Sequence, residues 1–165
     1  MSVVNPGGDL AMKMTLTIET AGSADARLLL ARADSATRAR YPDSPIHGFD
    51  PMEVADGKGA FAIARVDGRA VGCGAVRPLQ PGFGEIKKMY VEPEMRGRGI
   101  ARAILATLEG AARNLGFATI RLETGTKQPE AIRLYESSGY TPIPKYGEFA
   151  DDPLSVCFEK AVTFD

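Results

Sequence analysis

The chain has 165 residues, of which 44% are hydrophobic, and this is enough apolar material to bury the core of one compact domain. Its 20 lysines and arginines nearly balance 21 aspartates and glutamates, so the formal net charge of -1 provides no overall field for binding nucleic acid or an anionic membrane. With no signal peptide, no apolar stretch of membrane-spanning length and two cysteines inside apolar runs, we expect a cytoplasmic protein that makes no membrane contact.

The N-terminal part of the sequence predicts a lead, a strand and a helix. Residues 1–13 contain glycine and proline and are expected to form a flexible lead, and residues 14–165 a single domain. Met14 to Glu19 alternates as a first strand does. Ser23 is suited to cap a helix that runs from Ala24 toward Tyr41.

A three-stranded antiparallel meander is predicted in the middle of the chain. Pro42 to Lys58 is rich in turn residues and is expected to be a loop with at most one short helix. Two β-runs, Ala60 to Val66 and Ala70 to Pro78, flank Asp67-Gly68, a strong signal for a tight hairpin turn. A third run from Phe83 to Val91 completes the meander.

The third strand leads directly into a helix through a turn that contains glycine and arginine. The helix is predicted from Gly97 to Leu115, with Gly116 as its C-terminal stop, and a parallel strand is expected from Thr119 to Thr124. Around Arg96-Gly97-Arg98-Gly99, exposed backbone N–H groups at a helix start can converge on an anion, and a diphosphate suits such a place. A solvated basic turn is the plain alternative, but it does not account for the position of the turn between an apolar strand and a periodic helix.

Two familiar phosphate-binding motifs do not fit this turn. The chain has no Gly-x-x-x-x-Gly-Lys-Ser/Thr run, and Arg102 stands where a dinucleotide fingerprint needs its third glycine. The letters Arg96-x-x-Gly99-x-Ala101 instead resemble the Arg/Gln-x-x-Gly-x-Gly/Ala signature of the GNAT superfamily of acyl-CoA-dependent N-acyltransferases. Gln128 to Tyr140 resembles the second signature helix of that family, and Glu85 to Val91 its strand before the pyrophosphate loop.

The resemblance implies an α/β fold and a cofactor. The expected fold is a central mixed, mostly antiparallel sheet of about six to seven strands flanked by helices, with one parallel strand pair splayed around the cofactor. The expected cofactor is acetyl-CoA, released as CoA, and no metal is needed. The residues that the resemblance assigns to cofactor binding are Met89, Tyr90, Val91, Arg96, Gly97, Arg98, Gly99, Ile100, Ala101 and Gln128. Thr124 or Thr126 could take the role of Gln128.

Transfer of an acetyl group to an amine needs a proton acceptor and a proton donor. Freeing an alkylammonium at neutral pH costs about 4.6 kcal/mol, so a base is required, and the resemblance places it at Glu85. The alternative is that Glu85 is a strand residue paired with Lys87 or Lys88. Tyr135 has the position of the acid that serves the leaving thiolate, and the alternative is a core tyrosine with a satisfied hydroxyl.

The remaining candidates are weaker. His47, the only histidine, is expected at the surface or locally bonded, and Cys157 is expected to be inert because buried cysteines rarely act as nucleophiles. The loop from Tyr146 to Asp152 either borders the acceptor pocket or is an ordinary solvated loop.

The resemblance to the GNAT superfamily, with the residues that carry it, predicts an acetyl-CoA-dependent N-acetyltransferase. We expect it to move an acetyl group to a primary amine of a small molecule by direct attack in a ternary complex. A protein lysine or N-terminal acetyltransferase, a non-catalytic acyl-CoA-binding module and a nucleotide-binding regulator are the alternatives. The expected partner is the small-molecule amine, with no nucleic acid and no membrane, and a homodimer is left open.

Overall fold

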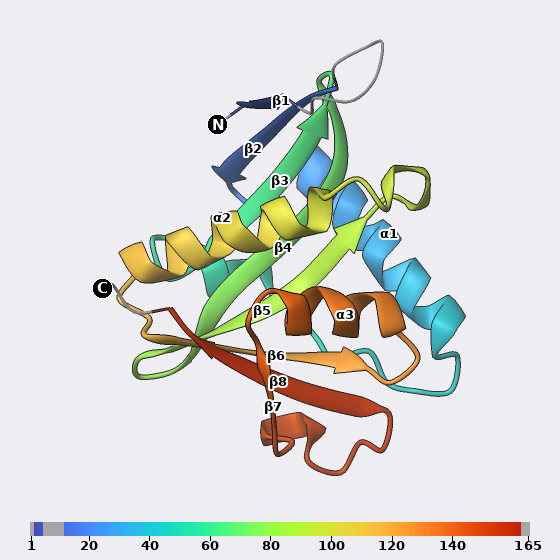
Figure 1. Cartoon of the computed structure of the whole chain (residues 1–165), viewed down its shortest axis with the longest axis vertical. Coiled ribbons are helices and arrows are strands. Elements are labelled where there is room, and N and C mark those ends of the chain that lie inside the picture. Colours follow the sequence, from blue (N-terminus) through green and yellow to red (C-terminus); the bar gives the residue numbers. More distant parts are fainter. Residues whose placement is uncertain (1, 5–11, 163–165) are drawn as a thin grey trace.

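A computed structural model describes residues 2–4 and 12–162 of the chain. It contains one eight-stranded sheet in the order β1-β2-β3-β4-β5-β6-β8-β7, in which only β5 and β6 run parallel (Figure 1). The strands are β1 (Ser2–Val4), β2 (Lys13–Glu19), β3 (Ala60–Val66), β4 (Arg69–Gln80), β5 (Phe83–Val91), β6 (Thr119–Gly125), β7 (Thr141–Ile143) and β8 (Ser155–Ala161). The predicted α/β fold with a mixed, mostly antiparallel sheet is confirmed.

The N-terminal lead contributes a strand that the sequence did not predict. Ser2–Val4 pairs antiparallel with the start of β2, and Lys13 is already the first residue of β2. This short edge strand explains why the sheet exceeds the expected six to seven strands. The remainder of the lead, at residues 1 and 5–11, lies outside the described residues.

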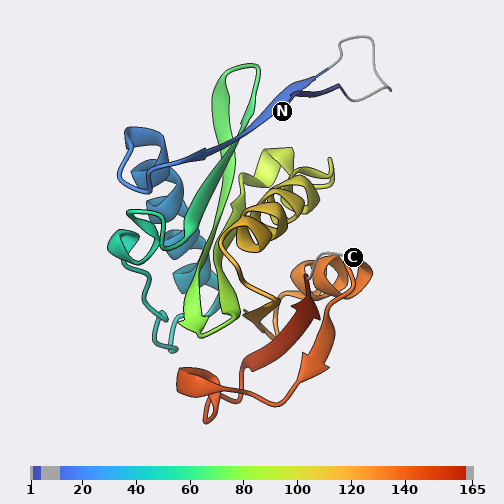
Figure 2. The same ribbon diagram turned by 90° about the vertical axis from the view of Figure 1, so that its left-hand side faces the viewer.

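The central meander and its turn agree with the prediction. Strands β3, β4 and β5 pair antiparallel in sequence, and Asp67 and Gly68 connect the first two with φ angles of 49° and 83°. Two successive positive φ angles are the requirement of the tight hairpin turn that matches strand twist. Near the end of the chain, β7 and β8 pair antiparallel as a further hairpin (Figure 2).

The described part of the chain also forms three α-helices: α1 (Ala24–Arg40), α2 (Ile100–Asn114) and α3 (Pro129–Ser137). Short 3-10 helices occur at Pro51–Val54 (η1), Pro93–Met95 (η2) and Gly147–Phe149 (η3), and η1 lies in the segment where a loop with at most one short helix was predicted. The side chain of Ser23 caps α1 by accepting from the backbone N–H of Ala26 at 3.1 Å, as predicted.

Helix α2 begins three residues later than the sequence pattern suggested. Gly97 and Gly99 have φ angles of 77° and 81°, which lie in the left-handed region and cannot continue a right-handed helix. The segment from Gly97 to Gly99 is therefore a turn, and the helix starts at Ile100. Gly116, with a φ of 86°, ends α2 as expected.

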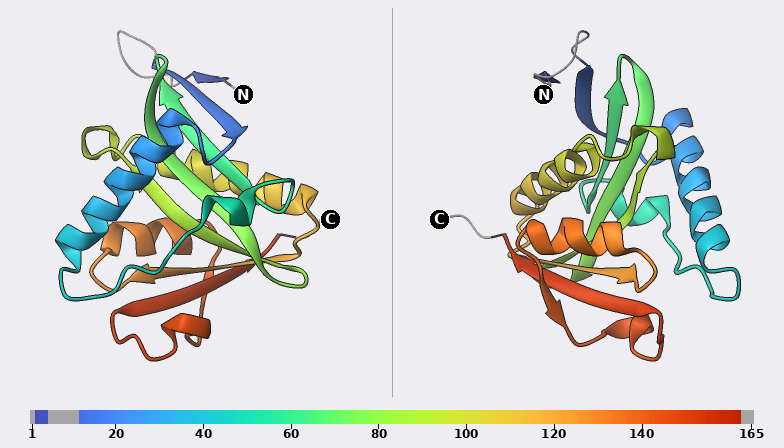
Figure 3. Two further views of the ribbon diagram at one scale, coloured as in Figure 1. Left: turned by 180° about the vertical axis from the view of Figure 1, so that it is seen from behind. Right: turned by 45° about the vertical axis from the view of Figure 1, so that its right-hand side comes forward.

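Helix α1 covers one face of the sheet, and α2 and α3 cover the other (Figures 1 and 3). Under α1, Ala26 and Leu29 pack with Phe61, Ile63 and Cys73. The larger core lies on the opposite face, where Ile104, Leu105 and Leu108 of α2 pack against sheet residues that include Ala62 and Ile86. Because helices pack against both faces of the sheet, the ends of its strands are held in defined positions.

Strands β5 and β6 pair over only part of their length. Their parallel register runs from Phe83 opposite Thr119 to Ile86 opposite Leu122 and then stops, although both strands continue. Figure 1 shows the two strands diverging beyond this point. The predicted splayed parallel pair is thus present, and it exposes the inner edges of both strands.

None of the helices in the described ranges is long and apolar enough to cross a membrane. Both cysteines are free and buried.

Candidate active site

A cavity of about 740 Å³ occupies the space between the diverging strands. Its walls are the C-terminal half of α1 with the loop that follows, the ends of β5 and β6, the turn before α2, and α3. The lining includes the residues predicted for cofactor binding and catalysis, except Arg98, Glu85 and the substitute candidate Thr126. Most of the residues predicted for the site therefore lie along one cavity.

The turn before α2 presents backbone donors to this cavity. The backbone N–H groups from Gly97 to Arg102 donate to no other residue that the structure describes, while the N–H of Ala103 bonds to the carbonyl of Gly99 at 3.1 Å. A Cβ atom added at Gly97 or Gly99 would meet no atom within 4 Å, so the space above both glycines is open. Unused amides at a helix N-terminus with open space before them can bind an anionic group.

Arginines surround this turn in different ways. Arg96 lines the cavity, and its Nε donates to the carbonyl of Val91 at 3.0 Å, which ties the turn to the end of β5. Arg102 also lines the cavity and donates to the hydroxyls of Ser137 and Ser138 at 2.8 and 3.1 Å. Arg98 donates to the sulfur of Met12 and does not line the cavity.

The end of β5 contains a bulge that shapes the cavity wall. The β4–β5 register shifts between Cys73, opposite Tyr90, and Ala75, opposite Lys87, and Lys88 has a φ of 58°. A bulge bends its strand and increases the local twist. This irregularity accompanies the departure of β5 from β6, and it leaves Met89, Tyr90 and Val91 along the cavity.

Tyr135 lies on α3 and is 5% exposed. Its ring packs edge-on against Tyr140 at 5.9 Å between centroids, yet its hydroxyl bonds to no described residue and the residue lines the cavity. Burial raises the pKa of the Tyr135 hydroxyl, and the charge of Glu123 adds to this effect. The hydroxyl therefore keeps its proton at neutral pH and can donate it into the cavity.

Gln128 immediately precedes α3, where its side-chain oxygen stabilises the local turn. It accepts from the hydroxyl of Thr124 at 3.2 Å and from the N–H of Gly125 at 3.1 Å. Its amide NH₂ group makes no hydrogen bond with another described residue. Thr124 and Gln128 line the cavity as one hydrogen-bonded unit, whereas Thr126 is absent from the lining.

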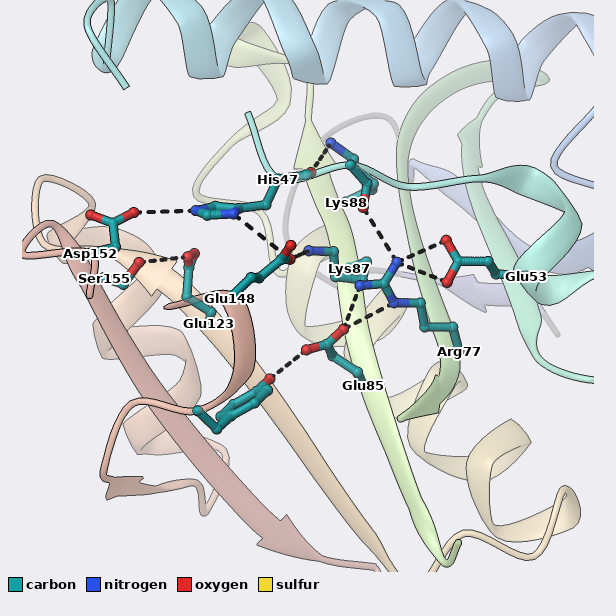
Figure 4. Close-up of polar contacts among 12 residues, drawn as sticks. His47, Glu53, Arg77, Glu85, Lys87, Lys88, Glu123, Glu148, Asp152 and Ser155 are labelled. Carbon is teal, nitrogen blue, oxygen red and sulfur yellow. Dashed lines mark hydrogen bonds and ion pairs between the residues drawn. The ribbon is translucent and has the colours of Figure 1, made fainter. Parts of the chain in front are cut away.

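Glu85 does not reach the cavity. It is 2% exposed on β5, and its carboxylate accepts from Arg77 Nε at 2.9 Å and from the Tyr146 hydroxyl at 2.6 Å. Arg77 stands directly opposite Glu85 in the β4–β5 register and also contacts Glu53 (Figure 4). Glu85 thus pairs with Arg77 rather than with Lys87 or Lys88, and the contacts with Arg77 and Tyr146 together occupy both of its carboxylate oxygens.

Glu123, which the sequence analysis did not single out, does line the cavity. It is half-buried at the diverging end of β6 and accepts one hydrogen bond, from the Ser155 hydroxyl of β8 at 3.1 Å. Burial raises the pKa of the Glu123 carboxyl, and the Ser155 hydrogen bond opposes part of that rise. A carboxylate with a raised pKa and an unused oxygen can accept a proton.

His47 joins two loops at the same end of the cavity. Its Nε2 lies 3.2 Å from Asp152 Oδ2 and its ring packs edge-on against Phe149, with 4.7 Å between ring centroids. Both His47 and Asp152 line the cavity, so the loop from Tyr146 to Asp152 does border it. The partners are 105 residues apart in sequence, and no local pattern could have linked them.

A mixed sheet split at its one parallel pair, with unused amides at the start of the next helix, defines the architecture of an acyl-CoA-dependent transferase. The chain belongs to the acetyltransferase (GNAT) family, whose model matches residues 27–140, and it is an N-acetyltransferase by class. It is 38% identical over 121 residues to the IAA acetyltransferase of Azospirillum brasilense, with 73% of this chain and 79% of the relative covered.

Solved structures agree with this assignment. A protein from Klebsiella pneumoniae described as an acyl-CoA N-acyltransferase superposes with a TM-score of 0.75 at 34% identity, covering 90% of this chain and 97% of the other. A GNAT family acetyltransferase from Elizabethkingia anophelis, solved with acetyl-CoA bound, shares the fold with a TM-score of 0.66 at 19% identity, covering 90% and 97%.

Proposed function

We propose that this protein transfers the acetyl group of acetyl-CoA to the primary amine of a small molecule, by direct attack in a ternary complex. The observation that carries the proposal is a continuous cavity that joins the unused amides of Gly97 to Arg102 with the side chains of Tyr135 and Glu123. One end of that cavity suits an anion and the other contains groups able to move protons.

The residues present fit a CoA thioester. The amides from Gly97 to Arg102 and the nearby guanidiniums of Arg96 and Arg102 match a diphosphate, which gains charge-assisted hydrogen bonds. The inner edge of β5 at Met89 to Val91, released from β6, is available to pair with an extended amide-containing arm. When bound, acetyl-CoA supplies an activated acyl group attached through sulfur.

The amine must lose a proton for the transfer, and we propose that Glu123 takes it. The sequence-based prediction assigned this role to Glu85, but both Glu85 oxygens are occupied and the residue is absent from the cavity lining. Glu123 lines the cavity, has an oxygen without a partner among the described residues, and has its pKa raised by burial. A raised pKa brings a carboxyl closer to the working pH of a general base.

Tyr135 is the proposed donor to the departing thiolate. Tyr135 lines the cavity, and the raised pKa of its hydroxyl means that the proton is present at neutral pH. The role is supported by position and by the absence of another hydrogen-bond partner for the hydroxyl among the described residues. We also propose a cytoplasmic location, which two free, buried cysteines support.

The proposal is tested by incubating the protein with acetyl-CoA and a library of amines and following the free thiol that is released. Amine-dependent thiol release with a matching acetylated product supports it. Far better turnover of peptides than of small amines would instead favour a protein acetyltransferase. Binding of acetyl-CoA with no thiol release for any amine or peptide would refute an enzymatic role.

A further inference from the structure

Lys87 is a buried cation with few nearby anions, at the end of the cavity that contains Glu123, where we place the acceptor amine. It lies on β5 where that strand leaves β6, lines the cavity, and has a side chain that is only 10% exposed. Its nearest carboxylate oxygen is Glu148 Oε1 at 3.9 Å, and its Nζ lies 5.3 Å from the centre of the Phe149 ring. It donates no hydrogen bond to any residue in the described ranges.

The neighbouring cations Lys88 and Arg77 each bind a carboxylate at hydrogen-bond distance, whereas Lys87 does not. Lys88 Nζ pairs with Asp34 Oδ1 at 3.0 Å, and the Arg77 guanidinium contacts both Glu53 and Glu85. An ammonium has three donors, and a buried one without acceptors is costly. Burial accordingly lowers the pKa of Lys87, against the opposing charge of Glu85.

Glu123 is the matching anion at this end of the cavity. The Asp152 carboxylate is occupied by His47 at 3.2 Å and by the N–H of Leu154 at 2.9 Å, whereas Glu123 accepts from Ser155 and from no other residue that the structure describes. Figure 4 shows Lys87 and Glu123 on separate strands, β5 and β6, on the two sides of the gap where these strands part. They do not pair with each other, so each has capacity for a ligand.

We propose that the acceptor is an amine that also carries a carboxylate, such as an amino acid, with its ammonium at Glu123 and its carboxylate at Lys87. This inference rests on the proposed function and narrows its substrate class. Lys87 is the specificity-determining residue in this arrangement. A bound carboxylate would supply the Lys87 ammonium with the hydrogen-bond acceptors that the protein itself does not provide. It would also orient the amine of the substrate toward the thioester.

The test uses pairs of amines that differ only in the carboxylate. Each L-amino acid is compared with the amine obtained by its decarboxylation, in thiol-release assays at saturating acetyl-CoA. We expect the amino acid of the best pair to have the higher kcat/KM. Lys87→Met should reduce that preference at least about tenfold, chiefly through KM, because a charge-assisted hydrogen bond is lost. Lys87→Arg should restore much of it.

The comparison of ratios between protein variants cancels the intrinsic reactivity of each amine. Lys58→Met removes a charge from an exposed position outside the cavity lining and should leave the preference unchanged. Circular dichroism and thermal melting establish that each variant is folded.

The outcomes separate the inference from the proposed function. If decarboxylated amines or diamines are equal or better acceptors and Lys87→Met leaves the ratio unchanged, the carboxylate site is refuted while the amine acetyltransferase remains. If no amine of either kind releases thiol although acetyl-CoA binds, the proposed function itself fails.

Discussion

Replacing Gly99 with glutamate separates the role of the turn before α2 from its effect on folding. Gly99 has a φ of 81° and open space where a Cβ would stand. A non-glycine residue in the left-handed region costs roughly 1–2 kcal/mol, so the variant should fold with a melting temperature lowered by about 2–8 °C. The new carboxylate would compete with a diphosphate for the same unused amides and repel it.

The expected loss of CoA affinity is much larger than the loss of stability. If two charge-assisted hydrogen bonds of about 1.5–3 kcal/mol each are removed, the dissociation constant rises by about two to four orders of magnitude. Isothermal titration calorimetry with CoA measures this change. Gly68→Glu is a matched control, since Gly68 has a φ of 83° and the same open space but lies in the β3–β4 turn.

The control should lose similar stability and bind CoA as the unmodified protein does. A folded Gly99→Glu variant whose CoA affinity lies within about threefold of the original would refute the assignment of the turn to the pyrophosphate.

Three further substitutions test the proton-transfer groups. Tyr135→Phe should lower kcat about 10²-fold with CoA affinity unchanged in calorimetry, and full activity would remove the donor role. Glu123→Gln should lower kcat/KM about 10²-fold and abolish the acidic limb of the pH–rate profile. Because burial raises the pKa of Glu123, that limb should lie above the ordinary glutamate value of about 4.3, with activity lost as the pH falls through it; an unchanged limb points to another base. Glu85→Gln should destabilise the fold by about 3 kcal/mol in urea melts, because Arg77 loses a buried partner, and should keep the limb in place. A stable variant without the limb would return the base to Glu85.

The turn and its flanking elements were predictable because their signals are local. Gly97 and Gly99 have the positive φ angles that only glycine adopts readily, and they stand between an apolar strand and a periodic helix. Asp67-Gly68 likewise specified its own turn. The start of α2 was predicted too early because periodicity alone does not register the left-handed residues.

The end of the cavity that contains Glu123 and His47 was not predictable from local sequence signals. Glu123 and Ser155 come from β6 and β8, and His47 meets Asp152 across two loops, so their proximity is created by the sheet order. The pairing of Glu85 was easier to predict from the sequence, because the hairpin register of β4 and β5 places Arg77 directly opposite Glu85. A buried cross-strand ion pair at that position explains why the carboxylate is a structural group.

A titration of the ¹⁵N-labelled protein with CoA, followed by the backbone amide resonances, tests whether the turn before α2 binds the cofactor. Binding through the turn predicts saturable shifts that are largest from Gly97 to Arg102 and extend along Met89 to Val91. Saturable CoA binding that leaves the amides of Gly97 to Arg102 unshifted would contradict the account.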